Sequence, residues 1–149
     1  MEVQALVDAS PLSNPRRVAV GLEGNRLAML LAVLHRHGGI VVGDQDVFIN
    51  VVGGIRVQET AADLPALLAV LSSMRDTPLA EKTIAFGEVG LSGEIRPVPN
   101  GEDRLREAAT HGFKRAIVPK GNAPKASAIK GMEVVAVERL ADALEAAFG

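Results

Sequence analysis

Runs of β-branched and apolar residues alternate along this 149-residue chain with segments of helical periodicity, and this alternation constrains the fold most. We expect strands at 3–7, 16–20, 47–52, 83–86, 116–118 and 133–137. We expect helices at 25–37, from about 60 to 75, at 101–111 and at 140–148. Alternating strands and helices predict a mixed α/β layer structure, in which helices pack on a sheet. No repeat or internal boundary interrupts the pattern, so we expect one domain spanning residues 1–149.

Local signals predict where these elements begin and end. Asn25 is a candidate N-cap for the first helix, and Gly38 with Gly39 should end it, because glycine adopts the left-handed C-terminal conformation easily. Thr60 and Asp63 have capping-box spacing at the second helix, although Asp63 alone is an equally good cap.

Further signals concern turns and buried faces. Gly53-Gly54 permits a bulge or a tight turn, and residues 87–99 predict a hairpin that turns at 91–93. The second helix should bury a leucine stripe, and the last helix should face inward with Leu140, Ala143, Leu144 and Ala147. The leucines of the stripe are Leu64, Leu67, Leu68 and Leu71.

Composition excludes several classes of function. The chain has no cysteine, so disulfides, thiolate zinc sites and cysteine nucleophiles are absent. His35, His37 and His111 fit helix ends or the surface, and we expect no metal site. The longest apolar run, residues 27–34, is shorter than the about 18–20 residues that a bilayer span requires. The N-terminus has no signal-peptide pattern, so we expect a cytoplasmic protein without membrane contact.

Glycine-rich loops raise the possibility of nucleotide binding, but their context does not fit it. The GxxGxxG run at 87–93 follows a strand and continues as strand, whereas a phosphate loop must open a helix. These glycines therefore fit a turn. The GxxxxGK[ST] pattern of a P-loop is absent from the chain.

Charge is unevenly distributed. Residues 111–132 hold five lysines and arginines and no acid, so with a net charge of −2 the rest of the chain carries −7. Such a stretch is either a binding surface for phosphate or an acidic partner, or a solvated loop.

Residues 53–119 resemble the proteolytic domain of Lon peptidases, which uses a serine nucleophile and a lysine base. The specific segments are 87–89 (GEV), 93–99 (GEIRPVP) and 112–119 (GFKRAIVP). A gap-free comparison puts Ala61 at the serine position and Glu102 at the lysine position. Alanine has no hydroxyl, and no lysine lies between Lys82 and Lys114, so the peptidase pair is missing and we expect no enzyme activity from this domain. A register shift of one would offer Thr60 as a nucleophile, still without its base, which leaves a Thr60-dependent hydrolase as a third hypothesis.

A Lon-like domain without its catalytic pair resembles the C-terminal region of the bacterial RadA (Sms) DNA-repair family. The phrases that carry this resemblance are 11–17 (PLSNPRR), 25–34 (NRLAMLLAVL), 46–48 (DVF), 52–55 (VGGI), 60–64 (TAADL) and 90–96 (GLSGEIR). The resemblance implies the fold of the second domain of ribosomal protein S5, which is an α+β layer arrangement. It also implies a DNA-dependent ATPase that promotes branch migration as a homo-oligomeric ring, a hexamer, alongside RecA-related recombination proteins. ATP, magnesium and zinc would belong to the family's ATPase core and zinc finger, and no cofactor is expected here.

The leading hypothesis is a non-catalytic scaffold that helps to form this ring and contacts DNA through backbone phosphates. The candidate contacts are Arg104, Arg106, Lys114, Arg115, Lys120 and Lys125, followed by Arg16, Arg17 and Arg26. Alternatively, Arg104 and Arg106 pair with acids on their own helix. Phe113 is the only nearby aromatic residue, which favours duplex contact over single-strand stacking. The second hypothesis is an oligomerisation module that does not contact DNA.

Overall fold

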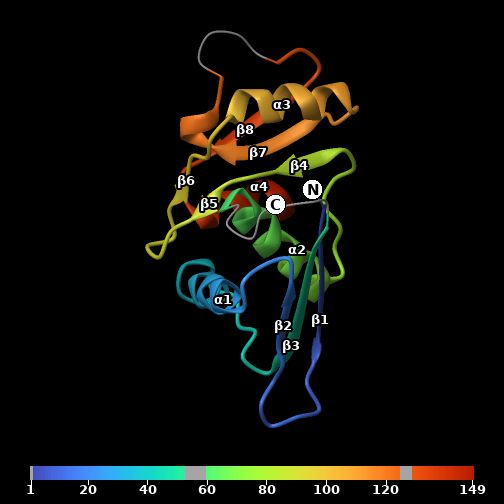
Figure 1. The fold of residues 1–149 in the computed structure, drawn as a ribbon, viewed down its shortest axis with the longest axis vertical. Coiled ribbons are helices and arrows are strands. Elements are labelled where there is room, and N and C mark those ends of the chain that lie inside the picture. Colours follow the sequence, from blue (N-terminus) through green and yellow to red (C-terminus); the bar gives the residue numbers. More distant parts are fainter. Residues whose placement is uncertain (1, 53–59, 125–128) are drawn as a thin grey trace.

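A computed structural model describes residues 2–52, 60–124 and 129–149 and contains two separate three-stranded sheets (Figure 1). The lower sheet in Figure 1 has the order β1-β3-β2 and consists of β1 (Glu2–Ala9), β2 (Arg17–Val20) and β3 (Gln45–Val52). Strand β3 is antiparallel to β1 and parallel to β2. The inner face of this sheet, with Val7, Val47 and Ile49, packs into the larger of two hydrophobic clusters.

The upper sheet is parallel and has the order β4-β7-β8. Its strands are β4 (Thr83–Ala85), β7 (Arg115–Pro119) and β8 (Glu133–Val137). Helix α3 (Gly101–Thr110) covers one face, where Leu105 packs with Ala116 and Val118 in the smaller cluster. Helix α4 (Leu140–Phe148) packs on the other face, where Leu140 joins Ile117 in the larger cluster. Helices together with parallel and antiparallel pairing make the fold α+β, as the sequence predicted.

Helix α1 (Gly24–Gly38) packs beside the lower sheet against β2 and α4, and α2 (Asp63–Arg75) contacts both β1 and β4 (Figure 1). The predicted leucine stripe of α2 is confirmed, because each of its four leucines is at most 1% exposed. Burying a leucine side chain stabilises a fold by roughly 1.5–3 kcal/mol. The leucine stripe therefore contributes strongly to the stability of the fold. The inward face predicted for α4 is also confirmed, with Leu140 and Ala143 buried and Leu144 and Ala147 half-buried.

The structure corrects two predicted helix caps. Helix α1 starts at Gly24 after Glu23, so Asn25 lies in its first turn and does not cap it. Residues Thr60–Ala62 form a 3-10 turn, η1, and Ala62 precedes α2 without a side-chain cap. The carboxylate of Asp63 bonds residues from other elements instead of its own helix. The predicted end of α1 is confirmed, because Gly39 has a φ of 71° and caps it.

Most predicted boundaries agree with the structure to within two residues. The predicted hairpin is confirmed as β5 (Glu88–Val89) paired with β6 (Ile95–Arg96), and Gly93 lies in its turn with a φ of 80°. A short 3-10 turn, η2 (Lys120–Asn122), follows β7. The bulge predicted at Gly53-Gly54 lies outside the described residues. Across the part of the chain that is described, no helix has both the length and the apolar character needed to cross a lipid bilayer.

Candidate nucleic-acid interface and the former catalytic positions

The two positions that the sequence comparison assigns to the Lon catalytic pair lie in different surroundings. Ala61, in η1, is fully buried and packs in the same hydrophobic cluster as Leu105 of α3. Its carbonyl accepts a hydrogen bond from the N–H of Gly87 at 3.1 Å, which ties η1 to the segment after β4. The methyl group of Ala61 offers no nucleophile.

Glu102 lies in the first turn of α3, and its side chain is 57% exposed. Its carboxylate accepts a hydrogen bond from Arg106 at 2.7 Å, one turn along the helix. The buried residues of α3 are Gly101, Leu105 and Ala108, so Glu102 does not share the face that packs against Ala61. Glu102 is thus exposed and paired with Arg106, whereas Ala61 is buried. Thr60 is half-buried at the start of η1.

A buried ion pair between α1 and α2 was not predicted from the sequence. Arg26 donates to Asp63 through Nε at 2.7 Å and through a second short bond from its other guanidinium nitrogen. The N–H of Val89, in β5, donates to the same carboxylate at 3.0 Å. Asp63 is fully buried, and burial raises its pKa, whereas the bonds from Arg26 and Val89 oppose the rise. The hydrogen bond to Asp63 in turn raises the pKa of Arg26. Arg26, a candidate DNA contact, thus binds the carboxylate that connects α1, α2 and β5.

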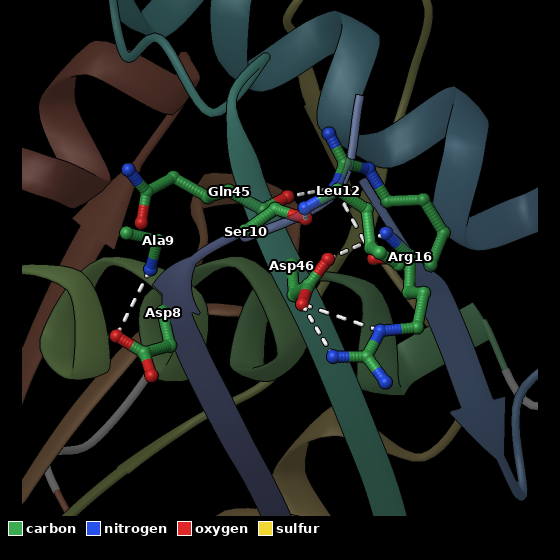
Figure 2. Close-up of polar contacts among 8 residues, drawn as sticks. Asp8, Ala9, Ser10, Leu12, Arg16, Gln45 and Asp46 are labelled. Atoms are coloured by element: carbon green, nitrogen blue, oxygen red, sulfur yellow. Dashed lines mark hydrogen bonds and ion pairs between the residues drawn. The ribbon is translucent and has the colours of Figure 1, made fainter. Parts of the chain in front are cut away.

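A second buried carboxylate, Asp46, engages Arg16 in the loop between β1 and β2 (Figure 2). Asp46 accepts from the backbone N–H of Arg16 at 2.6 Å and from its guanidinium at 2.8 and 3.3 Å. These bonds lower the pKa of Asp46 to about 2. The Arg16 guanidinium also lies 5.6 Å from the centre of the Phe48 ring. Arg17 donates to the carbonyls of Val42, at 2.9 Å, and Gln45.

The candidate DNA contacts near α3 and β7 are largely paired. Arg106 bonds Glu102, as the alternative interpretation expected, while Arg104 donates to the carbonyl of Pro99 at 2.9 Å and lies over Phe86. Two acids just beyond the basic stretch also take partners from it. Glu133 pairs with Arg115 and Glu138 pairs with Lys120, each at 2.8 Å. The sequence showed no acid within 111–132, but parallel pairing of β7 with β8 brings these acids alongside.

Lys114 differs from these residues. It is exposed, and within the described residues its side chain has no carboxylate partner. Its backbone N–H donates to the carbonyl of Lys82 at 2.8 Å, so two exposed lysines lie side by side where β4 and β7 begin. Sequence reasoning missed Lys82, because only the strand register reveals that 82 and 114 are neighbours. Lys125 lies outside the described residues. Across those residues there is no group of three or more histidine, aspartate or glutamate side chains that could hold a metal ion.

Comparisons with known proteins identify the family. The model of the family described as subunit ChlI of Mg-chelatase matches residues 25–122, about two-thirds of the chain. Among curated proteins, DNA repair protein RadA of Haemophilus influenzae is 67% identical over 97% of this chain and 31% of its own length. RadA of Escherichia coli K12 is 65% identical over 97% of the chain and 31% of its own length. RadA of Bacillus subtilis 168 is 42% identical over the whole chain and 32% of its own length.

The chain thus spans about a third of the length of the curated relatives that it matches. The resemblance to RadA inferred from the sequence is confirmed over nearly the whole chain. A ChlI-type domain is consistent with the Lon-like fold expected from the sequence. The chain belongs to the ChlI family of domains and corresponds to about one-third of DNA repair protein RadA.

Proposed function

We propose that this chain is a single, non-catalytic Lon-like domain that helps RadA to assemble on DNA and contacts the DNA backbone through exposed lysines. The similarity to proteins named DNA repair protein RadA supports a role in repair. In the longer proteins, we propose that the domain lines a homo-oligomeric ring in the cytoplasm. ATP hydrolysis, and any contact with RecA-related proteins, would then involve the rest of the molecule.

The absence of the catalytic pair supports a scaffold rather than a peptidase. Ala61 has no hydroxyl and is buried, and the carboxylate of Glu102 is held by Arg106. A Ser–Lys mechanism needs a hydroxyl and an amine within hydrogen-bond reach of each other. Neither group is present at these positions.

The observation that carries DNA contact is the pair of neighbouring lysines, Lys82 and Lys114, at the start of β4 and β7. Both residues are exposed, and the backbone hydrogen bond between them holds the two positions side by side. Phosphates attract such a pair without regard to base sequence. Arg115 and Lys120 lie on the following strand and turn, but each would have to leave a glutamate to reach a phosphate.

A fluorescence-anisotropy titration of labelled duplex DNA with variants of this chain tests the assignment. Neutralising both lysines (Lys82→Gln with Lys114→Gln) should weaken binding and reduce the salt dependence by about one unit of log–log slope per lost contact. Glu138→Gln should strengthen binding, because it frees Lys120. Arg36→Gln with Arg75→Gln removes the same two charges from the exposed C-terminal turns of α1 and α2 and is the matched control. Equal losses from the lysine variant and the control would contradict a localised contact.

One observation favours a second candidate function, a module for self-association alone. Large apolar side chains are exposed on the outer face of the lower sheet, including Leu6 at 58% and Val20 at 60%. Such exposed groups mark protein contacts more often than contacts with DNA. An oligomer that binds no duplex at low salt would favour this candidate.

A further inference from the structure

Strand β4 lies at an edge of the upper sheet and leaves backbone groups unpaired. The N–H of Phe86 donates to the carbonyl of Ile117 at 3.3 Å, so in this parallel ladder the peptide groups of Thr83 and Ala85 point away from β7. Within the described ranges, nothing bonds the N–H or the carbonyl of either residue. Such an edge is a template for a further strand, and natural proteins protect it, for example by covering it.

A cavity of about 380 Å³ lies against this edge. Thr83, Ile84 and Ala85 of β4 line one side of it. The other walls are mainly apolar and include Leu68 of α2 and the ring of Phe113. Its volume lies within the range of roughly 300–1,000 Å³ that is usual for binding pockets. The cavity is therefore large enough to receive side chains of a strand added to β4.

Thr83 gives a further sign that a neighbour is missing from this edge. Its Oγ1 is buried, and among the residues that the structure describes it has no hydrogen-bond partner. Buried hydroxyl groups are normally hydrogen-bonded, because the loss of water must be compensated. A strand along β4 would bond the N–H and the carbonyl of Thr83 and bring further polar groups within reach of its hydroxyl.

The first strand of the chain begins at the same cavity. Glu2 and Val3, the first two residues of β1, line the cavity together with β4. Figure 1 accordingly shows the N-terminus beside β4. A segment that precedes Glu2 therefore leaves the domain next to the open edge.

Most of the longer RadA polypeptide lies before this point. The chain resembles the C-terminal region of RadA and covers about one-third of the length of its relatives. A segment tethered beside a binding site has a high effective concentration there, in the millimolar range for a short flexible connection. The segment before Glu2 thus has an advantage over any untethered partner for the edge of β4.

We infer that the segment preceding β1 in full-length RadA adds a strand to the edge of β4 and places apolar side chains in the cavity. Main-chain hydrogen bonds to Thr83 and Ala85 would hold this strand, and the apolar walls would favour apolar side chains at alternate positions. The contact would fix this domain against the part of RadA that precedes it. The inference depends neither on DNA contact nor on self-association.

Amide hydrogen exchange tests the added strand. Two proteins are compared, this chain and the chain extended at its N-terminus by the about ten residues that precede it in RadA, which suffice for one strand. We expect the N–H groups of Thr83 and Ala85 to exchange about tenfold more slowly, or slower still, in the extended protein. The N–H of Ala19, which points away from β3 on the edge strand β2, is the matched control and should exchange equally in both.

Variants test whether the cavity receives the segment. Ala69→Phe fills the cavity from α2 and should remove the protection of β4. Ala28→Phe makes the same change at an exposed position of α1 and should leave the protection intact. An extension with the same residues in scrambled order should give no protection, and circular dichroism would verify that each protein folds.

Three results would overturn the inference. The first is equal exchange of Thr83 and Ala85 in the two proteins, or equal protection by the scrambled extension. The second is slow exchange of these groups in the chain without an extension, because the edge would then already be covered. The third is protection in full-length RadA but not in the extended chain, which would assign the edge to another part of the protein.

Discussion

Two buried carboxylates show how single residues hold this fold together. Asp63 joins α1, α2 and β5 through Arg26 and Val89, while Asp46 anchors the β1–β2 loop through Arg16. Neither partnership follows from sequence spacing, because the partners are 37, 26 and 30 residues apart. The sequence offered Asp63 as one of two alternative caps, beside Thr60, since aspartate at a helix start usually bonds its own backbone. In the structure the Asp63 carboxylate accepts from Arg26 of another helix instead of capping its own helix.

We expect Asp63→Asn to lower the free energy of unfolding by roughly 3 kcal/mol, because it leaves the partly buried guanidinium of Arg26 without its counter-charge. Urea unfolding followed by circular dichroism measures the change. Glu81→Gln, at an exposed position just before β4, is the control and should have little effect. A loss for Asp63→Asn no larger than that of the control would show that the pair contributes nothing to stability.

The pKa of Asp46 makes stability depend on acid. Its pKa falls from 3.8 in the unfolded chain to about 2 in the folded one. The unfolded state therefore binds the proton more tightly, and the stabilisation present above the unfolded pKa is lost as the pH falls toward the folded value. We expect the urea midpoint of the wild type to fall more steeply between about pH 4 and pH 2 than that of Asp46→Asn. Parallel pH profiles for the two proteins would contradict this assignment.

At the scale of elements, hydrophobic periodicity predicted the type and the position of most helices and strands. The contacts between side chains on neighbouring strands follow only from the strand register. The stripe of α2, the hairpin of β5 and β6 and the glycine end of α1 each arise from local pattern. The charge pattern was less informative. The acid-free stretch looked like one basic surface, but β8 and the residue after it bring Glu133 and Glu138 to Arg115 and Lys120. The neighbouring lysines 82 and 114 arise from the same sheet, and sequence distance hides them.

The orientation of α3 leads to a prediction about Ala61 and Glu102, which the sequence comparison assigns to the Lon catalytic pair. Because Glu102 lies on the exposed face of α3 while Ala61 is buried, restoring both family residues should not restore chemistry. We expect the double variant Ala61→Ser with Glu102→Lys to show no peptidase activity above the wild-type chain in a fluorogenic peptide assay. A fluorophosphonate probe would report any activated serine directly. Labelling of the double variant, absent from the single variant Ala61→Ser, would show that a lysine at 102 does reach position 61.

At the scale of the whole molecule, two sheets with separate clusters leave two kinds of surface exposed. The upper sheet presents lysines at the start of its strands, and the lower sheet presents exposed apolar side chains, among them Leu6 and Val20. Charge at one end and apolar surface at the other would let one domain contact DNA and a second copy at once. Sequence alone predicted both activities through family resemblance, but it assigned the DNA contact to several residues that the structure engages in ion pairs.

The most direct test of DNA contact is the affinity of the unmodified chain for labelled duplex DNA, measured by fluorescence anisotropy across a series of salt concentrations. We expect binding at low salt and a log–log plot of the association constant against salt that falls linearly, with a slope of about −0.9 for each phosphate contacted. The two exposed lysines set the expected minimum at about two contacts. No binding at the lowest salt concentration, or an affinity that does not change with salt, would contradict the proposal that this domain lies on the path of the DNA.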